Sequence, residues 1–154
     1  MRSAWMIAAV VVAALGCQRP AVGPPRLVVG ALRHGLDPFL EAHRLADGAE
    51  IRADLVERTS GASVHVVQVR GSERPHRHVE HDVVVQMLRG EGVLTLGATR
   101  VPMQPGDVVV IPRGALHYFA SAPGTTAVAL ATFAPPLDAP DYVPADVDSP
   151  GGRR

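Results

Sequence analysis

The sequence predicts an all-β domain, a sandwich or barrel of short strands, with one short helix before it. From Ile51 onward, seven short runs follow one another in which valine is the commonest residue, and each is closed by Gly, Pro or Ser. β-Branched residues suit a pleated, half-buried surface, and many short strands at regular spacing are typical of sandwiches and barrels. The 154 residues of the chain are enough for one such domain and too few for two ordinary ones.

Residues 1–16 have the features of a signal peptide. One cation, Arg2, precedes an uncharged apolar run that is shorter than the roughly 20 residues a membrane-spanning helix needs. The segment Ala13-Ala14-Leu15-Gly16-Cys17 resembles a bacterial lipobox, with Ala14 where leucine is usual. The resemblance implies a lipidated Cys17 that anchors the chain in the bacterial envelope, at the outer membrane or facing the periplasm. A plain secretory or periplasmic signal and an apolar core helix are the alternatives.

The body of the chain divides into a linker, a barrel and a tail. Residues 17–30 begin at the lipidated cysteine and continue as a proline-rich, extended linker. The barrel domain is predicted over residues 31–134, and residues 135–154 form a tail rich in proline and aspartate. We expect the start of the tail to lie over the sheet and its end to be disordered.

Within the domain, the helix and the strands are predicted from local signals. Asp37-Pro38 predicts an N-cap and a first helical residue, so the helix would run to about Leu45 and pack through Phe39 and Leu40. The strands are predicted at residues 51–57, 63–70, 83–89, 93–96, 108–111, 116–120 and 126–133.

Three of the seven histidines fall within six residues, at His76, His78 and His81. Residues two apart on a strand point to the same face, so His76 and His78 would present two imidazoles to one ion. A further histidine, His117, follows the turn Pro112-Arg113-Gly114. From there it can approach the pair from a neighbouring strand. Imidazole suits several first-row transition metals, so the pattern indicates a metal site without selecting the ion.

These motifs resemble those of the cupin superfamily, in the small, single-domain, type-2 form. Gly106, Pro112, Gly114 and His117 have the spacing of its second motif (residues 106–121), in which Ser121 replaces the usual asparagine. The H-x-H pair belongs to its first motif (residues 71–90), which Gly90 closes. The resemblance implies a jelly-roll barrel, or double-stranded β-helix, that binds one divalent transition metal: iron, manganese, zinc, nickel or copper.

The first motif departs from the family pattern at its glutamate. Counting back from Gly90 by the family's interval reaches Val83, so the strict glutamate is missing. Either His81 or Asp82 can take its place if the chain bulges after His78. The predicted ligand set is therefore His76, His78 and His117, completed by His81 or Asp82.

The sequence leaves the activity open among three readings. Cupin resemblance implies a metal-dependent enzyme, of the dioxygenase, decarboxylase or isomerase type, that acts on a small molecule, but no residue selects a reaction or a catalytic group. A non-catalytic module that holds a metal or a small ligand at the envelope is the alternative. The third reading is an assembly domain, since cupins often form homodimers through sheet edges. A net charge of zero and only six aromatic residues argue against a nucleic-acid partner.

Overall fold

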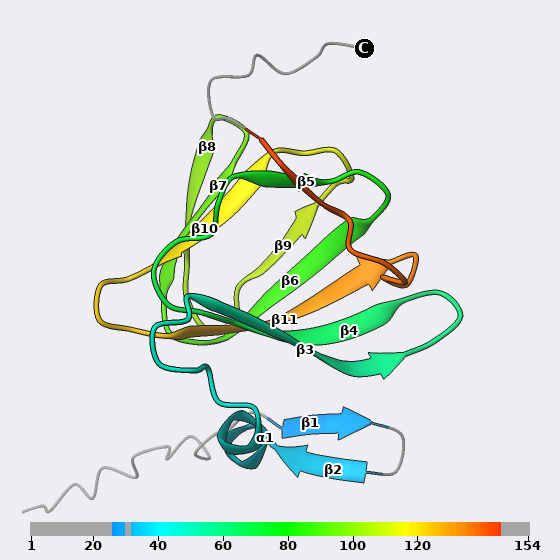
Figure 1. The fold of residues 1–154 in the computed structure, drawn as a ribbon, viewed down its shortest axis with the longest axis vertical. Coiled ribbons are helices and arrows are strands. Elements are labelled where there is room, and N and C mark those ends of the chain that lie inside the picture. The colour runs from blue at the N-terminus through cyan, green and yellow to red at the C-terminus, as the bar shows by residue number, and fades with distance from the viewer. Residues whose placement is uncertain (1–25, 30–31, 146–154) are drawn as a thin grey trace, which may run out of the picture.

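The computed structural model describes residues 26–29 and 32–145, and the predicted signal peptide and Cys17 lie outside them. Two five-stranded antiparallel sheets form a barrel (Figure 1). Sheet 1 has the order β12-β5-β10-β7-β8, and sheet 2 has the order β3-β4-β11-β6-β9. The strands of sheet 1 are β5 (His76–His78), β7 (Gly92–Leu96), β8 (Thr99–Met103), β10 (His117–Ser121) and β12 (Tyr142–Pro144). Those of sheet 2 are β3 (Ile51–Arg58), β4 (Ser63–Val69), β6 (Asp82–Arg89), β9 (Val108–Ile111) and β11 (Ala127–Ala134). The predicted all-β fold with one short helix is confirmed.

The interior of the barrel is one apolar core between the two sheets. Alternate residues of each strand point inward, as the twofold period of a strand requires. The cluster combines residues from both sheets: Val69, Val83, Met87, Leu94, Met103, Ile111, Phe119, Ala127, Ala131 and Phe133. Burying these side chains supplies most of the driving force for folding.

A second, smaller core lies on the outer face of sheet 2. The helix α1 (Leu36–Ala42) packs Leu36 against Val66 of β4 and Val128 of β11, with Phe39 and Leu40 beside them. The strand β11 is therefore apolar on both faces. The packing roles predicted for Phe39 and Leu40 are confirmed.

The ends of α1 differ from the prediction. The N-cap is Gly35, which makes no side-chain capping bond, and the helix ends at Ala42 rather than near Leu45. Asp37 lies instead in the first turn, where an acidic group is favourable, and pairs with Arg89 of β6. The Asp37 carboxylate therefore pairs with a residue far away in the sequence instead of capping the N-terminus of its own helix.

Before the helix, β1 (Arg26–Val29) and β2 (Leu32–Gly35) form an antiparallel pair. The strand β1 lies inside the segment predicted as linker. In Figure 1 this pair and α1 lie on the side of sheet 2 that faces away from β5 and β12. No helix in the described residues is both long enough and apolar enough to cross a membrane.

Candidate metal centre and its cavity

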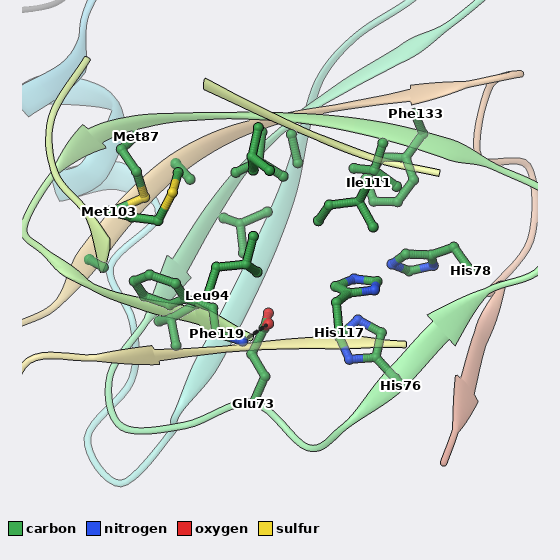
Figure 2. Close-up of a pocket in the computed structure, with 18 residues that line it drawn as sticks. Glu73, His76, His78, Met87, Leu94, Met103, Ile111, His117, Phe119 and Phe133 are labelled. Carbon is green, nitrogen blue, oxygen red and sulfur yellow. Dashed lines mark hydrogen bonds between the residues drawn. The ribbon is translucent and has the colours of Figure 1, made fainter. Parts of the chain in front are cut away.

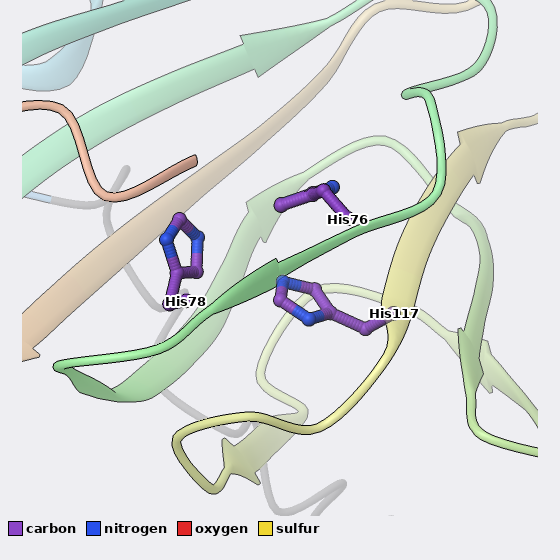
Figure 3. Close-up of side chains that lie close together, drawn as sticks. All are labelled: His76, His78 and His117. Atoms are coloured by element: carbon purple, nitrogen blue, oxygen red, sulfur yellow. The ribbon is translucent and has the colours of Figure 1, made fainter. Parts of the chain in front are cut away.

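Three of the predicted ligands converge at one end of the barrel. The imidazoles of His76, His78 and His117 each offer a nitrogen, and these nitrogens lie within 4.8 Å of one another (Figure 3). His76 and His78 lie on β5. His117 lies on the neighbouring strand β10, directly opposite His76 in the antiparallel pairing of the two strands. Because the HRH sequence places two histidines two residues apart, both reach the same face of the strand.

The backbone of the β9–β10 turn helps to set the position of His117. Gly114 has φ +75°, a left-handed conformation that favours glycine, and its N–H donates to the carbonyl of His78 at 2.6 Å. Ser121, which stands where the motif has asparagine, lies at the other end of β10. Its Oγ accepts a hydrogen bond from the Gly71 N–H, and its own N–H donates to the Gly71 carbonyl, both at 2.8 Å. The strand β10 is thereby fixed at both ends to the segment around β5.

The three rings share one hydrogen-bonding scheme. In each, Nδ1 donates to a backbone carbonyl: His76 to Arg74 at 2.8 Å, His78 to Asp141 at 3.1 Å and His117 to Ala115 at 3.0 Å. A proton held on Nδ1 leaves the lone pair of Nε2 free, and this is how metal-binding histidines are commonly oriented.

Burial keeps these imidazoles neutral. His76 and His117 are each 4% exposed. The pKa of His117 is lowered to about 4, chiefly by desolvation and in part by the nearby His76 and His78, although its bond to Ala115 opposes the shift. Desolvation also lowers the pKa of His76 and His78. Since a metal binds the neutral ring, the three side chains fit a transition-metal ion.

Neither residue predicted to complete the shell joins the three imidazoles. His81 is buried, but its Nδ1 lies 2.5 Å from Asp141 Oδ2 and its Nε2 lies 3.3 Å from the Pro136 carbonyl. Both of its ring nitrogens are therefore engaged elsewhere. The ring packs against Phe133, which also contacts His78.

Asp82 lies on the outside of the barrel. Its carboxylate accepts hydrogen bonds from the Arg113 side chain and backbone N–H, both at 2.9 Å, and these bonds lower its pKa. Parity with His76 and His78 does not extend to Asp82, because the chain bends at residues 79–80 between β5 and β6. The inward row of β6 is instead Val83, Val85 and Met87.

Glu73 is a site residue that the sequence analysis missed. Its Oε2 accepts a hydrogen bond from the Phe119 N–H at 2.9 Å, and its carboxyl group points into the barrel (Figure 2). Burial raises the pKa of Glu73, although the bond from Phe119 opposes the shift. No family motif position singles this residue out. The available signal was an acidic residue three places before a histidine pair.

The imidazoles and Glu73 line a single cavity of about 100 Å³ between the sheets. The other lining residues are apolar, and Met87 and Met103 lie at the end away from the histidines (Figure 2). Such a cavity, with a few convergent polar groups, is the usual form of a small-molecule site.

The sequence of the barrel strands identifies the family of this chain. Residues 63–133 match the model of the Cupin domain, which includes both strands that carry the three histidines. The chain belongs to the cupin superfamily. An uncharacterized protein of Aquifex aeolicus (strain VF5) is 35% identical to this cupin over 94 residues, which are 61% of this chain and 77% of that protein.

Solved structures agree with this assignment. An RmlC-like cupin protein from Desulfovibrio desulfuricans is 27% identical, with a TM-score of 0.54, and the match covers 63% of this chain and 92% of that one. KdgF from a Halomonas species is 26% identical, with a TM-score of 0.53, and the match covers 57% of this chain and 81% of that one.

Proposed function

We propose that this cupin is a metal-dependent enzyme that converts a small molecule inside its barrel. The observation that carries the proposal is that three clustered imidazoles and one carboxyl group line the same apolar cavity. The imidazole set fits one divalent transition metal, held by His76, His78 and His117. When bound, such an ion supplies Lewis acidity, or redox chemistry if it is iron, manganese, nickel or copper.

The protein groups around the ion have separable tasks. Backbone carbonyls hold the three rings through Nδ1 and leave Nε2 free, so little reorganisation accompanies binding. Apolar walls exclude water from the reacting groups. Glu73 is the one carboxyl group that lines the cavity among the described residues. Its raised pKa suits a group that donates or accepts a proton at a bound molecule.

A non-catalytic binding module is the second candidate. It is favoured by the absence of His81 and Asp82 from the imidazole cluster, because among the described side chains no carboxylate completes the shell. Both candidates bind metal, and they differ in turnover.

Metal analysis of the full chain, purified in detergent without a polyhistidine tag, tests the site. We expect about one equivalent of metal, and its loss in His76→Ala and His117→Ala. His65→Ala is the matched control, because His65 lies in the barrel wall and bonds Ser63 rather than the cluster. Equal metal content in all four proteins would contradict the ligand assignment.

Glu73→Gln separates the two candidates. The amide oxygen can still accept the hydrogen bond from Phe119, so metal binding should persist, whereas proton transfer is lost. Screens of dioxygen uptake and decarboxylation should then find turnover in the wild type and a loss of about 10²–10⁴-fold in the variant. A metal-loaded wild type that binds small molecules without converting them would favour the binding module.

We also propose that Cys17 is lipidated and holds the protein at the bacterial envelope. The support is the lipobox-like segment 13–17 after an apolar run. Fractionation of a Cys17→Ser variant tests this proposal.

A further inference from the structure

The walls of the cavity leave a ligand few polar partners. Of the lining residues, only Glu73 and the three histidines carry polar side chains. The others are valine, leucine, isoleucine, methionine, phenylalanine and alanine side chains. Within residues 26–29 and 32–145 no arginine lines the cavity, and the chain contains no lysine. An anionic group on the ligand would therefore find positive charge only at the metal end.

This composition discriminates strongly between ligands. A ligand hydroxyl placed among these side chains gives up its hydrogen bonds to water and gains none in return. Each such unpaired group lowers the affinity by about tenfold or more, whereas a methylene in the same place gains from leaving water. Sugars and polyols are thus disfavoured everywhere except beside the metal and Glu73.

The available space also limits the ligand. The inward face of β11 presents only the methyl groups of Ala127, Ala129 and Ala131 to the cavity, so this wall takes up little of its space. For comparison, a cavity of about 150 Å³ accommodates benzene. By the same ratio, a volume of about 100 Å³ holds about four non-hydrogen atoms, beyond those that reach the metal.

We propose that the ligand of this site is a small molecule with one oxygen-bearing, metal-binding end and a short hydrocarbon body. The oxygen end lies between the three imidazoles and Glu73, and the hydrocarbon body extends toward Met87 and Met103. This inference rests on the proposed metal site and adds the chemical class of the substrate.

Two hydroxamic acids with the same chelating head test the proposal. Butanohydroxamic acid has a hydrocarbon tail, and 2,3,4-trihydroxybutanohydroxamic acid carries hydroxyls on the same carbon chain. The full chain is loaded with Co²⁺, each compound is titrated while the visible Co²⁺ spectrum is recorded, and metal retention is measured afterwards. We expect the hydrocarbon compound to bind at least tenfold more tightly.

Substitution of the cavity wall provides a second, independent measurement. Ala129→Leu should fill the space of the tail and weaken butanohydroxamic acid at least tenfold. Acetohydroxamic acid, whose tail is one methyl group, should bind this variant nearly as well as it binds wild type. Ala53→Leu is the matched control, since Ala53 is exposed on β3 and does not line the cavity. It should leave all three affinities unchanged.

The outcomes separate this inference from the proposed metal site. One equivalent of Co²⁺ with equal or tighter binding of the trihydroxy compound would overturn the inference and leave the metal site standing. So would one equivalent of Co²⁺ with no binding of either compound, or an Ala129→Leu variant that binds the hydrocarbon tail as before. Failure to bind Co²⁺ at all would overturn the proposed function, and this inference with it.

Discussion

The hydrogen bonds at Nδ1 decide which nitrogen each histidine of the cluster can offer to an ion. All three Nδ1 acceptors are main-chain carbonyls, at Arg74, Ala115 and Asp141. A carbonyl cannot donate a proton, so each of these bonds requires the proton on Nδ1. Burial then opposes a second proton on Nε2. Neutral rings are thus available at pH 7 without any competing protonation.

His117 should make the stability of the metal-free protein depend on pH. Its pKa is about 4 in the folded chain and about 6.5 when unfolded. The unfolded chain therefore binds the proton more readily, and stability falls as the pH decreases from about 6.5 to about 4. Between pH 7 and pH 5, we expect His117 to account for a loss of about 2 kcal/mol.

Chemical denaturation of the metal-free wild type and of His117→Asn at these two pH values measures this contribution. Since the pKa values of His76 and His78 are also lowered, both proteins should lose stability. The wild type should lose more. Equal losses in the two proteins would mean that His117 titrates normally in the folded chain.

At this scale, the sequence predicts residues that follow a strand's alternation and misses those placed by bends. His76 and His78 satisfy a two-residue spacing inside β5, and they were predicted correctly as neighbours of His117. His81 and Asp82 lie outside the imidazole cluster, because the bend at residues 79–80 changes which way the chain faces. Glu73 reaches the cavity from a loop, where no periodicity applies.

Among the elements, the strand β12 has a role that the sequence did not predict, because it contacts the strand that carries two of the proposed ligands. It pairs antiparallel with β5, which places Tyr142 opposite His78 and Pro144 opposite His76. Tyr142 stacks on His76 with ring centroids 4.3 Å apart, and the Asp141 carbonyl accepts from His78. The segment predicted as a tail therefore supports two of the three proposed ligands.

Composition explains why β12 could not be predicted from the sequence. Its surroundings are rich in proline and aspartate, and proline is tolerated at a sheet edge, where a missing N–H costs little. The short β5 and the Pro102-containing β8 also fell outside the predicted runs. By contrast, seven strands of at least four residues were placed within one residue of their observed ends, because their runs of strand-forming residues are bounded by turn residues.

The side chain of Asp141 holds this segment in place. Its carboxylate accepts from the N–H groups of Val79 and Glu80 at 3.1 and 3.0 Å and contacts His81 at 2.5 Å. Burial alone would raise the pKa of Asp141, but these hydrogen bonds together keep it below its usual range. The carboxylate thus fixes the position of the carbonyl that orients His78.

Asp141→Ala should weaken metal binding about 10–100-fold, the usual effect of removing a residue that orients a ligand. Competition with a chromophoric chelator measures the affinity. Asp138→Ala is the control, because Asp138 lies in the same segment, is exposed and pairs with Arg58 rather than with β5. An unchanged affinity in Asp141→Ala would show that β12 does not position His78.

For the whole molecule, the two sheets separate the N-terminal segment from the site. The helix α1 and the β1–β2 pair precede sheet 2, and α1 packs on its outer face. The proposed ligands come from β5 and β10 of sheet 1. Between Cys17 and Arg26 there are nine peptide units, which span at most about 30 Å when extended. A lipid on Cys17 would therefore keep the barrel near the membrane surface without involving the strands that carry the histidines.

Cys17→Ser should accordingly change where the protein is found and leave its site intact. Stable anchoring requires more than one acyl chain, and serine cannot accept the thioether-linked lipid of a bacterial lipoprotein. We expect the wild type in the membrane fraction and a large loss of the variant from it. Metal content should stay at about one equivalent, because the three proposed metal ligands all lie on strands of sheet 1. A variant that remains in the membrane with an unprocessed N-terminus would show instead that the apolar segment itself is the anchor.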